Sequence, residues 1–337
     1  MSELRRDPIG GRWVIVNTDE PTPPEGYEHD IPRSNKPLPC PFCYGNEMHT
    51  PPEIIALREP NTAPNSPGWH VRVVPNKFPA LQIEGELERR GLGIYDMSNG
   101  IGAHEVIIET PYHDKDMTDL TVSEIASILH FYCQRSLDLE RDKRFKYIMI
   151  FKNYGASAGA SLEHPHTQLI ALPMVPKSVR EEIQGANNYY EYRERCIFCD
   201  ILRQEMQEKE RIIIENKSFI AFCPFVSRFP FEIWIMPMSH TSLFCQTPYE
   251  ELPKMAEVLK AVLVKIRKIF GDTSYNFIIH TAPVNSDGTN IEGYHWHLEF
   301  LPKLTRVAGF EWGTGFYIVP TPPEIAAKYL RDASVTE

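Results

Sequence analysis

Several short segments of the chain alternate apolar with polar residues or concentrate β-branched ones, and each pattern predicts a β-strand. In the first half these segments cover residues 12–16, 69–74, 105–109, 145–151 and 169–172. Residues 76–81 read as a turn that leads into another short strand. The proline-rich, polar stretch 21–39 between the first strands predicts a loop.

Residues 121–142 carry their apolar side chains at the spacing of an amphipathic helix. Thr121 and Glu124 form a capping-box pattern at its start. One long helix is therefore expected in the first half, with strand-like segments before and after it in the sequence.

The same order of patterns returns in the second half. Strand-like segments cover residues 216–222, 231–240, 275–280 and 294–300, and a second helical pattern covers residues 249–270. We therefore predict a tandem duplication, with units at 1–183 and 184–337. A polar connector at 177–191 is expected to be helical.

Composition narrows the possible functions. The 337 residues are 42% hydrophobic and carry a formal charge of -10, so a general nucleic-acid binder, which needs clustered Lys and Arg, is not expected. The chain has no window of about 20 apolar residues and no secretory signal at its start, so we expect a cytoplasmic protein without a membrane span.

Seven cysteines are present, and four of them form two Cys-x-x-Cys pairs. One such pair alone could equally be a redox motif. Here each half supplies the pair, then a histidine that closes a strand, then the first histidine of a His-x-His. The two resulting sets are Cys40, Cys43, His113, His164 and Cys196, Cys199, His240, His295. Two such sets predict two structural Zn²⁺ sites. Cys133, Cys223 and Cys245 are expected to be buried as small apolar residues.

Residues 153–168 combine a run of Gly, Ala and Ser with two histidines and a glutamine. Small residues allow the backbone to approach an anion closely. If the end of the segment is extended, His164, His166 and Gln168 share one face. His166 belongs to neither metal set, so its imidazole could attack phosphorus while the Gln168 amide holds a phosphoryl oxygen.

These features together resemble the galactose-1-phosphate uridylyltransferase family of the histidine-triad superfamily. The resemblance rests on Leu4-Arg-Arg-Asp-Pro8, Trp13-Val-Ile-Val16, the first Cys-x-x-Cys, residues 155–161, His164-Pro-His-Thr-Gln168 and Phe229-Pro-Phe-Glu232. It implies an α+β fold of two histidine-triad-like halves, each an antiparallel sheet with a long helix packed on it. The two sheets would merge into one extended sheet, and the protein would be a homodimer.

The resemblance also implies a ping-pong exchange between UDP-glucose and galactose 1-phosphate through a nucleotidyl-His166. Gln168 and Ser161 would contact phosphoryl oxygens, and Asn76, Asn153 and Phe310 would lie near the nucleotide or phosphate. The second half lacks the small-residue run and carries Glu299 where Gln168 stands in the first half. We therefore expect only the first half to be active.

Two departures from the family pattern keep other hypotheses open. Characterised uridylyltransferases have lost the second cysteine pair and can hold iron through a glutamate and three histidines; the corresponding alternative here uses His280, His297 and Glu299. The intact second Cys-x-x-Cys is more similar to the ADP-glucose phosphorylase branch.

The arginines that family members carry after the first strand are also missing, and Arg33 or Lys36 are the candidate substitutes. The alternative functions are therefore adenylyl transfer from ADP-glucose to phosphate, or a zinc-stabilised nucleotide-binding module without turnover.

Overall fold

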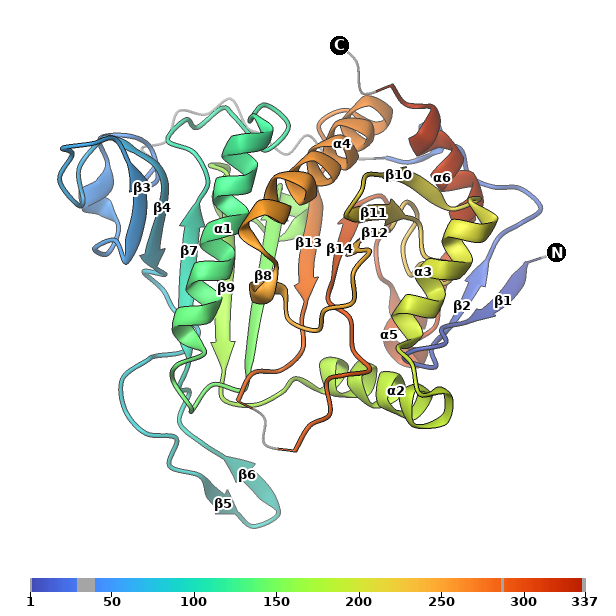
Figure 1. Ribbon diagram of the computed structural model, residues 1–337, viewed down its shortest axis with the longest axis horizontal. Helices are drawn as coiled ribbons and strands as arrows, with labels where there is room; N and C mark the ends of the chain where they lie inside the picture. The colour runs from blue at the N-terminus through green and yellow to red at the C-terminus, as the bar shows by residue number, and fades with distance from the viewer. Residues whose placement is uncertain (1, 29–39, 286–287, 335–337) are drawn as a thin grey trace.

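The computed structural model describes residues 2–28, 40–285 and 288–334, and a ten-stranded antiparallel sheet runs through it (Figure 1). Across the sheet the strands are β10 (Ile212–Glu215), β11 (Phe219–Phe222), β12 (Ile233–Pro237), β14 (His297–Pro302), β13 (Tyr275–His280), β8 (Tyr147–Tyr154), β9 (His166–Leu172), β7 (Ala103–Ile108), β4 (Trp69–Pro75) and β3 (Ile55–Arg58). The predicted α+β class with antiparallel strands is confirmed.

The strand order is symmetric about the β8–β13 pair, where Tyr154 lies opposite Tyr275. Outward from this pair, β8-β9-β7-β4-β3 on one side matches β13-β14-β12-β11-β10 on the other. One continuous sheet therefore joins the two parts of the chain. We retain two units at 1–183 and 184–337 as a proposal. Their boundary falls inside helix α2 (Lys177–Arg193), which forms where the connector was expected.

Helices α1 (Val122–Leu139) and α4 (Leu252–Phe270) lie side by side across one face of the sheet (Figure 1). The Thr121 side chain accepts from the backbone N–H of Glu124 and the Glu124 carboxylate accepts in return, as the capping box predicts. Both helices bury an apolar face, and the core cluster takes in residues of both halves. Burial of this shared core, more than helix propensity, stabilises the helices.

Smaller elements surround the main sheet. They are the sheet of β1 (Glu3–Arg6), β2 (Trp13–Val16) and β15 (Tyr317–Val319), the hairpin β5 (Arg90–Leu92) and β6 (Tyr95–Met97), helices α3 (Ile197–Glu208), α5 (Gly309–Thr314) and α6 (Pro323–Asp332), and 3-10 turns at Pro24–Gly26, Glu47–His49, Ala156–Ala158, Phe244–Gln246 and Tyr249–Glu251. Among the described residues, none of the helices has the length and apolar content that crossing a membrane requires.

The strand expected after Asn76 does not form. Residues 77–81 are irregular, and only an isolated bridge from Gln82 to Ile101 follows them, whereas β11 forms after Asn216 in the second half. Pro79 has no N–H to give to a sheet, and the N–H of Ala80 is bonded to the His104 ring instead. The sequence patterns also did not predict α3, α6 or β10.

The capping box gives a direct test of α1. Replacing Thr121 with Ala removes the acceptor for the Glu124 N–H, so we expect the free energy of unfolding to fall by about 1 kcal/mol. Denaturant unfolding of Thr121→Ala and of the control Thr121→Ser measures the difference. A loss in the serine variant as large as that in the alanine variant would contradict the cap as its cause.

Candidate active site and metal centres

His166 is the first residue of β9, and β9 is paired with β7 on one side and β8 on the other. Its ring Nδ1 lies 2.8 Å from the carbonyl oxygen of His164. A carbonyl can only accept, so Nδ1 carries the proton and Nε2 keeps its lone pair. Burial lowers the pKa of His166, which favours the neutral ring. The geometry therefore presents a fixed, unprotonated nitrogen.

Gln168 lies two residues further along β9, on the same face as His166. Its Oε1 is 2.8 Å from Nε2 of His104, a residue of β7 that the sequence analysis did not single out. The same His104 nitrogen lies 3.0 Å from Nδ2 of Asn76. His104 thus connects two of the predicted site residues.

The loop before β9 owes its shape to glycine. Gly155 and Gly159 have φ of 84° and 86°, in the region that side-chain-bearing residues avoid. The side chain of Asn276, from β13, donates to Asn153 Oδ1 at 2.8 Å and to the Ala158 carbonyl at 2.9 Å. The second half of the chain therefore holds the loop of the first half in place, and Asn153 takes part.

Two other residues were predicted to contact the substrate, Ser161 and Phe310. Ser161 is exposed in the loop between the 3-10 turn Ala156–Ala158 and β9. Phe310 lies on α5, which contacts β15 and is well separated from β9 in Figure 1. Within one chain the structure does not bring Phe310 to His166. Arg33 and Lys36 lie outside the described residues.

A buried ion pair lies beneath His166, on the face of the sheet that α1 covers. Lys152 Nζ is 2.7 Å from Glu109 Oε2 and 3.2 Å from the His166 carbonyl oxygen, and the side chains of both charged residues are at most 1% exposed. Thr167 donates to the other Glu109 oxygen at 2.5 Å and receives a bond from Tyr132 at 2.7 Å. The sequence offered one indication of this ion pair, namely that Lys152 stands at a core-facing position of β8.

The first metal set is assembled as predicted. The ligand atoms of Cys40, Cys43, His113 and His164 all lie within 4.8 Å of one another. Cys43 Sγ is 3.4 Å from His113 Nδ1 and 3.7 Å from His164 Nδ1. A tetrahedral zinc with ordinary bond lengths would place sulfur and nitrogen about 3.5 Å apart. His164 Nε2 is 2.7 Å from the Thr110 carbonyl, to which it donates, so Nδ1 is the nitrogen available to a metal.

The second set has matching geometry. Cys196, Cys199, His240 and His295 also bring their ligand atoms within 4.8 Å of one another. Cys199 Sγ is 3.4 Å from His240 Nδ1 and 3.6 Å from His295 Nδ1. One difference is that Nε2 of His295 is buried without a hydrogen-bond partner among the described residues. The structure thus contains two His/Cys groups that could hold a metal.

A third group in the second half differs from the alternative expected from the sequence. Its members are Glu182, His280 and His297, so the carboxylate comes from α2. Glu299 instead forms an ion pair with Arg228, although it also lies 3.2 Å from His280. Glu182 is remote in sequence from both histidines, so no local spacing could indicate it.

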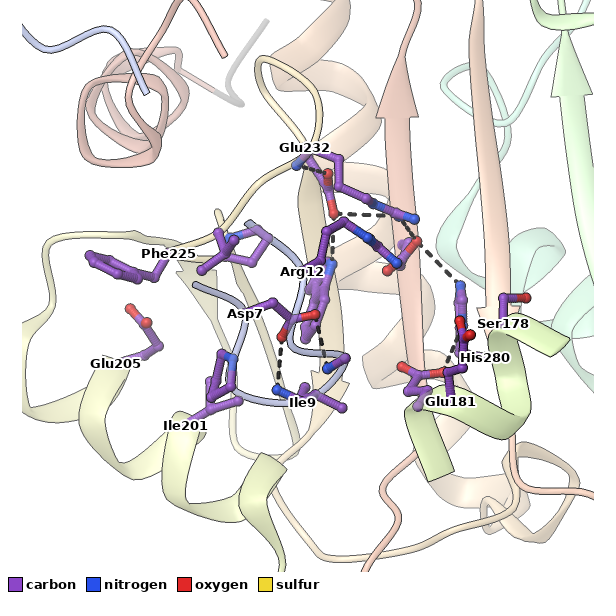
Figure 2. A pocket seen from close by; sticks show the side chains of 18 of the residues that line it. Asp7, Ile9, Arg12, Ser178, Glu181, Ile201, Glu205, Phe225, Glu232 and His280 are labelled. Atoms are coloured by element: carbon purple, nitrogen blue, oxygen red, sulfur yellow. Dashed lines mark hydrogen bonds and ion pairs between the residues drawn. The ribbon is translucent and has the colours of Figure 1, made fainter. Parts of the chain in front are cut away.

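Helices α2 and α3 cover the part of the sheet around His297. His297 is fully buried, with Glu182 of α2 at 3.4 Å and the Phe198 ring of α3 at 5.3 Å. A cavity of about 190 Å³ remains beside it. Figure 2 shows side chains around this cavity from α2, from α3 and from the N-terminal segment, which supplies Arg12. Glu232, directly before β12, also lines the cavity. The position equivalent to His166 is therefore enclosed.

Comparisons with known proteins show what the whole chain is similar to. A family model described as a domain of unknown function (DUF4921) matches residues 100–336. The chain is 37% identical to the ADP-glucose phosphorylase of Arabidopsis thaliana, over 99% of this chain and 93% of that protein. It is 30% identical to the galactose-1-phosphate uridylyltransferase of Thermotoga maritima, over 99% of both. A crystal structure of an Arabidopsis thaliana ADP-glucose phosphorylase with bound ADP-glucose matches all of both chains with a TM-score of 0.84 and 36% identity.

The buried pair beneath His166 generates a stability prediction. Lys152→Met leaves the Glu109 charge buried without its partner, so the free energy of unfolding should fall by about 3–5 kcal/mol. Lys152→Met combined with Glu109→Leu should recover much of this loss, because neither charge remains. Denaturant unfolding measures both variants.

The exposed i,i+4 pair Lys177–Glu181 on α2 provides the matched control, and Lys177→Met should change the stability by less than about 0.5 kcal/mol. Equal effects of Lys152→Met and Lys177→Met would contradict the importance of the buried pair.

Proposed function

The chain belongs to the galactose-1-phosphate uridylyltransferase family, and we propose that it is a nucleotidyltransferase that uses His166 as the nucleophile. The observation that carries the proposal is the bond from His166 Nδ1 to the His164 carbonyl, which leaves Nε2 unprotonated beside a glycine-shaped loop. A neutral imidazole held in this way is a suitable nucleophile towards phosphorus.

The proposed reaction has two displacements. In the first, Nε2 of His166 forms a bond to the α-phosphorus of a nucleotide sugar, and the bond from this phosphorus to the bridging oxygen breaks. The sugar 1-phosphate leaves with the electron pair. In the second, an oxygen of the acceptor attacks the same phosphorus and the N–P bond breaks, which restores the neutral ring. The His164 carbonyl stabilises the positive charge on the ring in the intermediate through Nδ1–H.

The amide side chains around His166 supply neutral donors for the phosphoryl oxygens. We propose that Gln168 and Asn76 donate to these oxygens and that Asn153 shapes the adjoining loop, with Ser161 completing the contacts. Donors held before the substrate arrives do not need to reorganise during the reaction, which is the main advantage of such a site. Phe310 would reach the site only from a second copy of the chain, as in the homodimer that the family resemblance implies.

Two nucleotide donors are comparably supported. UDP-glucose with galactose 1-phosphate as acceptor corresponds to the Thermotoga maritima relative. ADP-glucose with inorganic phosphate as acceptor corresponds to the Arabidopsis thaliana relative and to the structure with bound ADP-glucose. The intact second set of two cysteines and two histidines favours the second donor, because the resemblance associates this feature with the phosphorylase branch.

We propose that each His/Cys set holds one structural Zn²⁺. Two thiolates and two imidazoles suit zinc, and four protein ligands leave no position open for a substrate. In the first set, His164 would join β9 to the loop that carries Cys40 and Cys43. This link would fix the backbone carbonyl that orients His166.

Replacing the two equivalent histidines tests which half is catalytic. His166→Gly removes the nucleophile, so turnover should fall by about 10⁴-fold or more while the fold is retained. His297→Gln should keep most of the activity, because His297 is enclosed and stands beside Glu299 rather than a glutamine. Circular dichroism establishes that both variants are folded. Equal losses of activity in two folded variants would overturn the assignment to the first half.

Incubation with UDP-glucose and with ADP-glucose, each labelled in the α-phosphate, identifies the donor. A phosphoramidate is labile in acid and stable in base, so the expected product is a labelled protein with these properties that is absent from His166→Gly. The nucleotide that labels the protein and is released by the matching acceptor is the substrate. Absence of labelling with both nucleotides would instead indicate a binding module without turnover.

Metal analysis tests the zinc proposal. We expect about two zinc ions per chain, and one fewer in either Cys40→Ser or Cys196→Ser. Cys40→Ser should lower both turnover and melting temperature, whereas Cys196→Ser should chiefly lower the melting temperature. A parent protein with one zinc, unchanged by Cys196→Ser, would show that the second set holds no zinc.

A further inference from the structure

We propose that His104 is a positioning residue that fixes the orientation of the Gln168 side-chain amide, an inference that rests on the proposed function of the His166 site. Neither the sequence motifs nor the resemblance pointed to this residue. The orientation of Gln168 depends on which nitrogen of the His104 ring carries the proton, and the hydrogen bonds around the ring decide this.

The backbone N–H of Ala80 donates to Nδ1 of His104 at 3.2 Å. A backbone N–H can only donate, so Nδ1 must be the unprotonated nitrogen. A neutral imidazole has one N–H, which is therefore on Nε2. His104 Nε2 lies 2.8 Å from Oε1 of Gln168, and an N–H at this position donates to that oxygen. The loop after Asn76 thus selects the tautomer of His104.

This donation has a consequence for Gln168. An amide side chain can rotate by half a turn and exchange its oxygen and nitrogen. With Oε1 held by His104, the NH₂ group of Gln168 is the end left for a ligand. The reversed orientation would present a carbonyl oxygen, which repels a phosphoryl oxygen. His104 therefore determines whether Gln168 attracts or repels the anion.

The sheet register places the two residues within reach. Gln168 lies opposite Val106, and His104 lies opposite Ile170, so His104 and Gln168 are diagonal neighbours on one face of the β7–β9 pair. Two β-strands rather than a flexible loop therefore set their separation.

The backbone fixes the orientation of the Asn76 amide, and the same tautomer of His104 leaves the NH₂ group of Asn76 without an acceptor on this ring. Oδ1 of Asn76 accepts from the backbone N–H of Phe78 at 2.9 Å, which fixes the NH₂ group at the other end of the amide. That group lies 3.0 Å from His104 Nε2, but a protonated Nε2 cannot accept from it. The N–H groups of Asn76 are thus left for another acceptor, such as a phosphoryl oxygen. The two amides supply the donors for an anion, whereas the single N–H of His104 is used in holding Gln168.

Nitrogen NMR tests the tautomer without any assay of activity. In protein labelled with ¹⁵N at histidine, the side-chain signals that are missing from His104→Gln belong to His104. The expected pattern at neutral pH is that of a neutral ring protonated at Nε2. A ring protonated at Nδ1, or at both nitrogens, would overturn the inference, whether or not the protein is an enzyme.

Kinetics test the role in positioning. His104→Leu has no donor for Gln168, so the rate of nucleotidylation of His166 should fall about 10-fold, less than the ~10²–10³ that follows loss of a direct donor. His104→Gln keeps a donor at the position of Nε2, so its rate should return to within about 3-fold of the parent. KM for the nucleotide sugar should change little, because the interaction strengthens as charge develops on the phosphoryl group.

The control is His70→Leu, which removes an exposed histidine of the neighbouring strand β4 that pairs with Glu59. Melting temperatures show whether each variant is folded. Equal rates in His104→Leu and the parent, or no recovery in His104→Gln, would overturn the proposal. A parent protein that forms no adduct with either nucleotide would reject the proposed function of His166, and the NMR result would still decide the tautomer.

Discussion

Strand β9 lies between β7 and β8, and its backbone hydrogen bonds to both neighbours fix the groups on which the site depends. The strand carries His166 and Gln168, and the residue two positions before His166 belongs to the first metal set. A central strand has no free edge along which to shift, and a one-residue slip would turn the histidine and the glutamine to the opposite face. The chemistry of the site is thus tied to the register of the sheet.

The two faces of β9 serve different purposes. On one face His166 and Gln168 are flanked by His104 and Asn76, whose groups are neutral donors and acceptors. On the other face Lys152 and Glu109 form a buried pair that is bonded through Thr167 and the His166 carbonyl. A buried pair of this kind is weak evidence for stability, because both charges must leave water. Its direct contact with the His166 backbone indicates that it defines the position of the strand.

The two parts of the sheet share an order of strands but have diverged in what covers them. Around β14 the position equivalent to His166 is enclosed by α2 and α3, and Glu299 is paired with Arg228. Around β9 the corresponding positions carry amides and a loop of small residues. The second part still contributes to the first, since Asn276 of β13 holds the loop before β9. The second part therefore shares the core and also supports the loop of the first part.

The sequence by itself determined the features that depend on short spacings. Strand and helix periodicities indicated the strands and both long helices, the capping box indicated the start of α1, and the class of fold came from the motifs that carry the family resemblance. Cysteines three positions apart marked the two metal sets, and the repeat of the pattern in both halves indicated their histidines. Residues two positions apart placed His166 and Gln168 on one face, which follows from the backbone geometry of a single strand. Only the tertiary structure decided that Lys152 meets Glu109, 43 residues away, that His104 meets Gln168, 64 residues away, and that Glu182 closes over His297. Such contacts depend on the register between strands and on how helices pack over a sheet, and no local pattern of apolar and polar residues encodes either one.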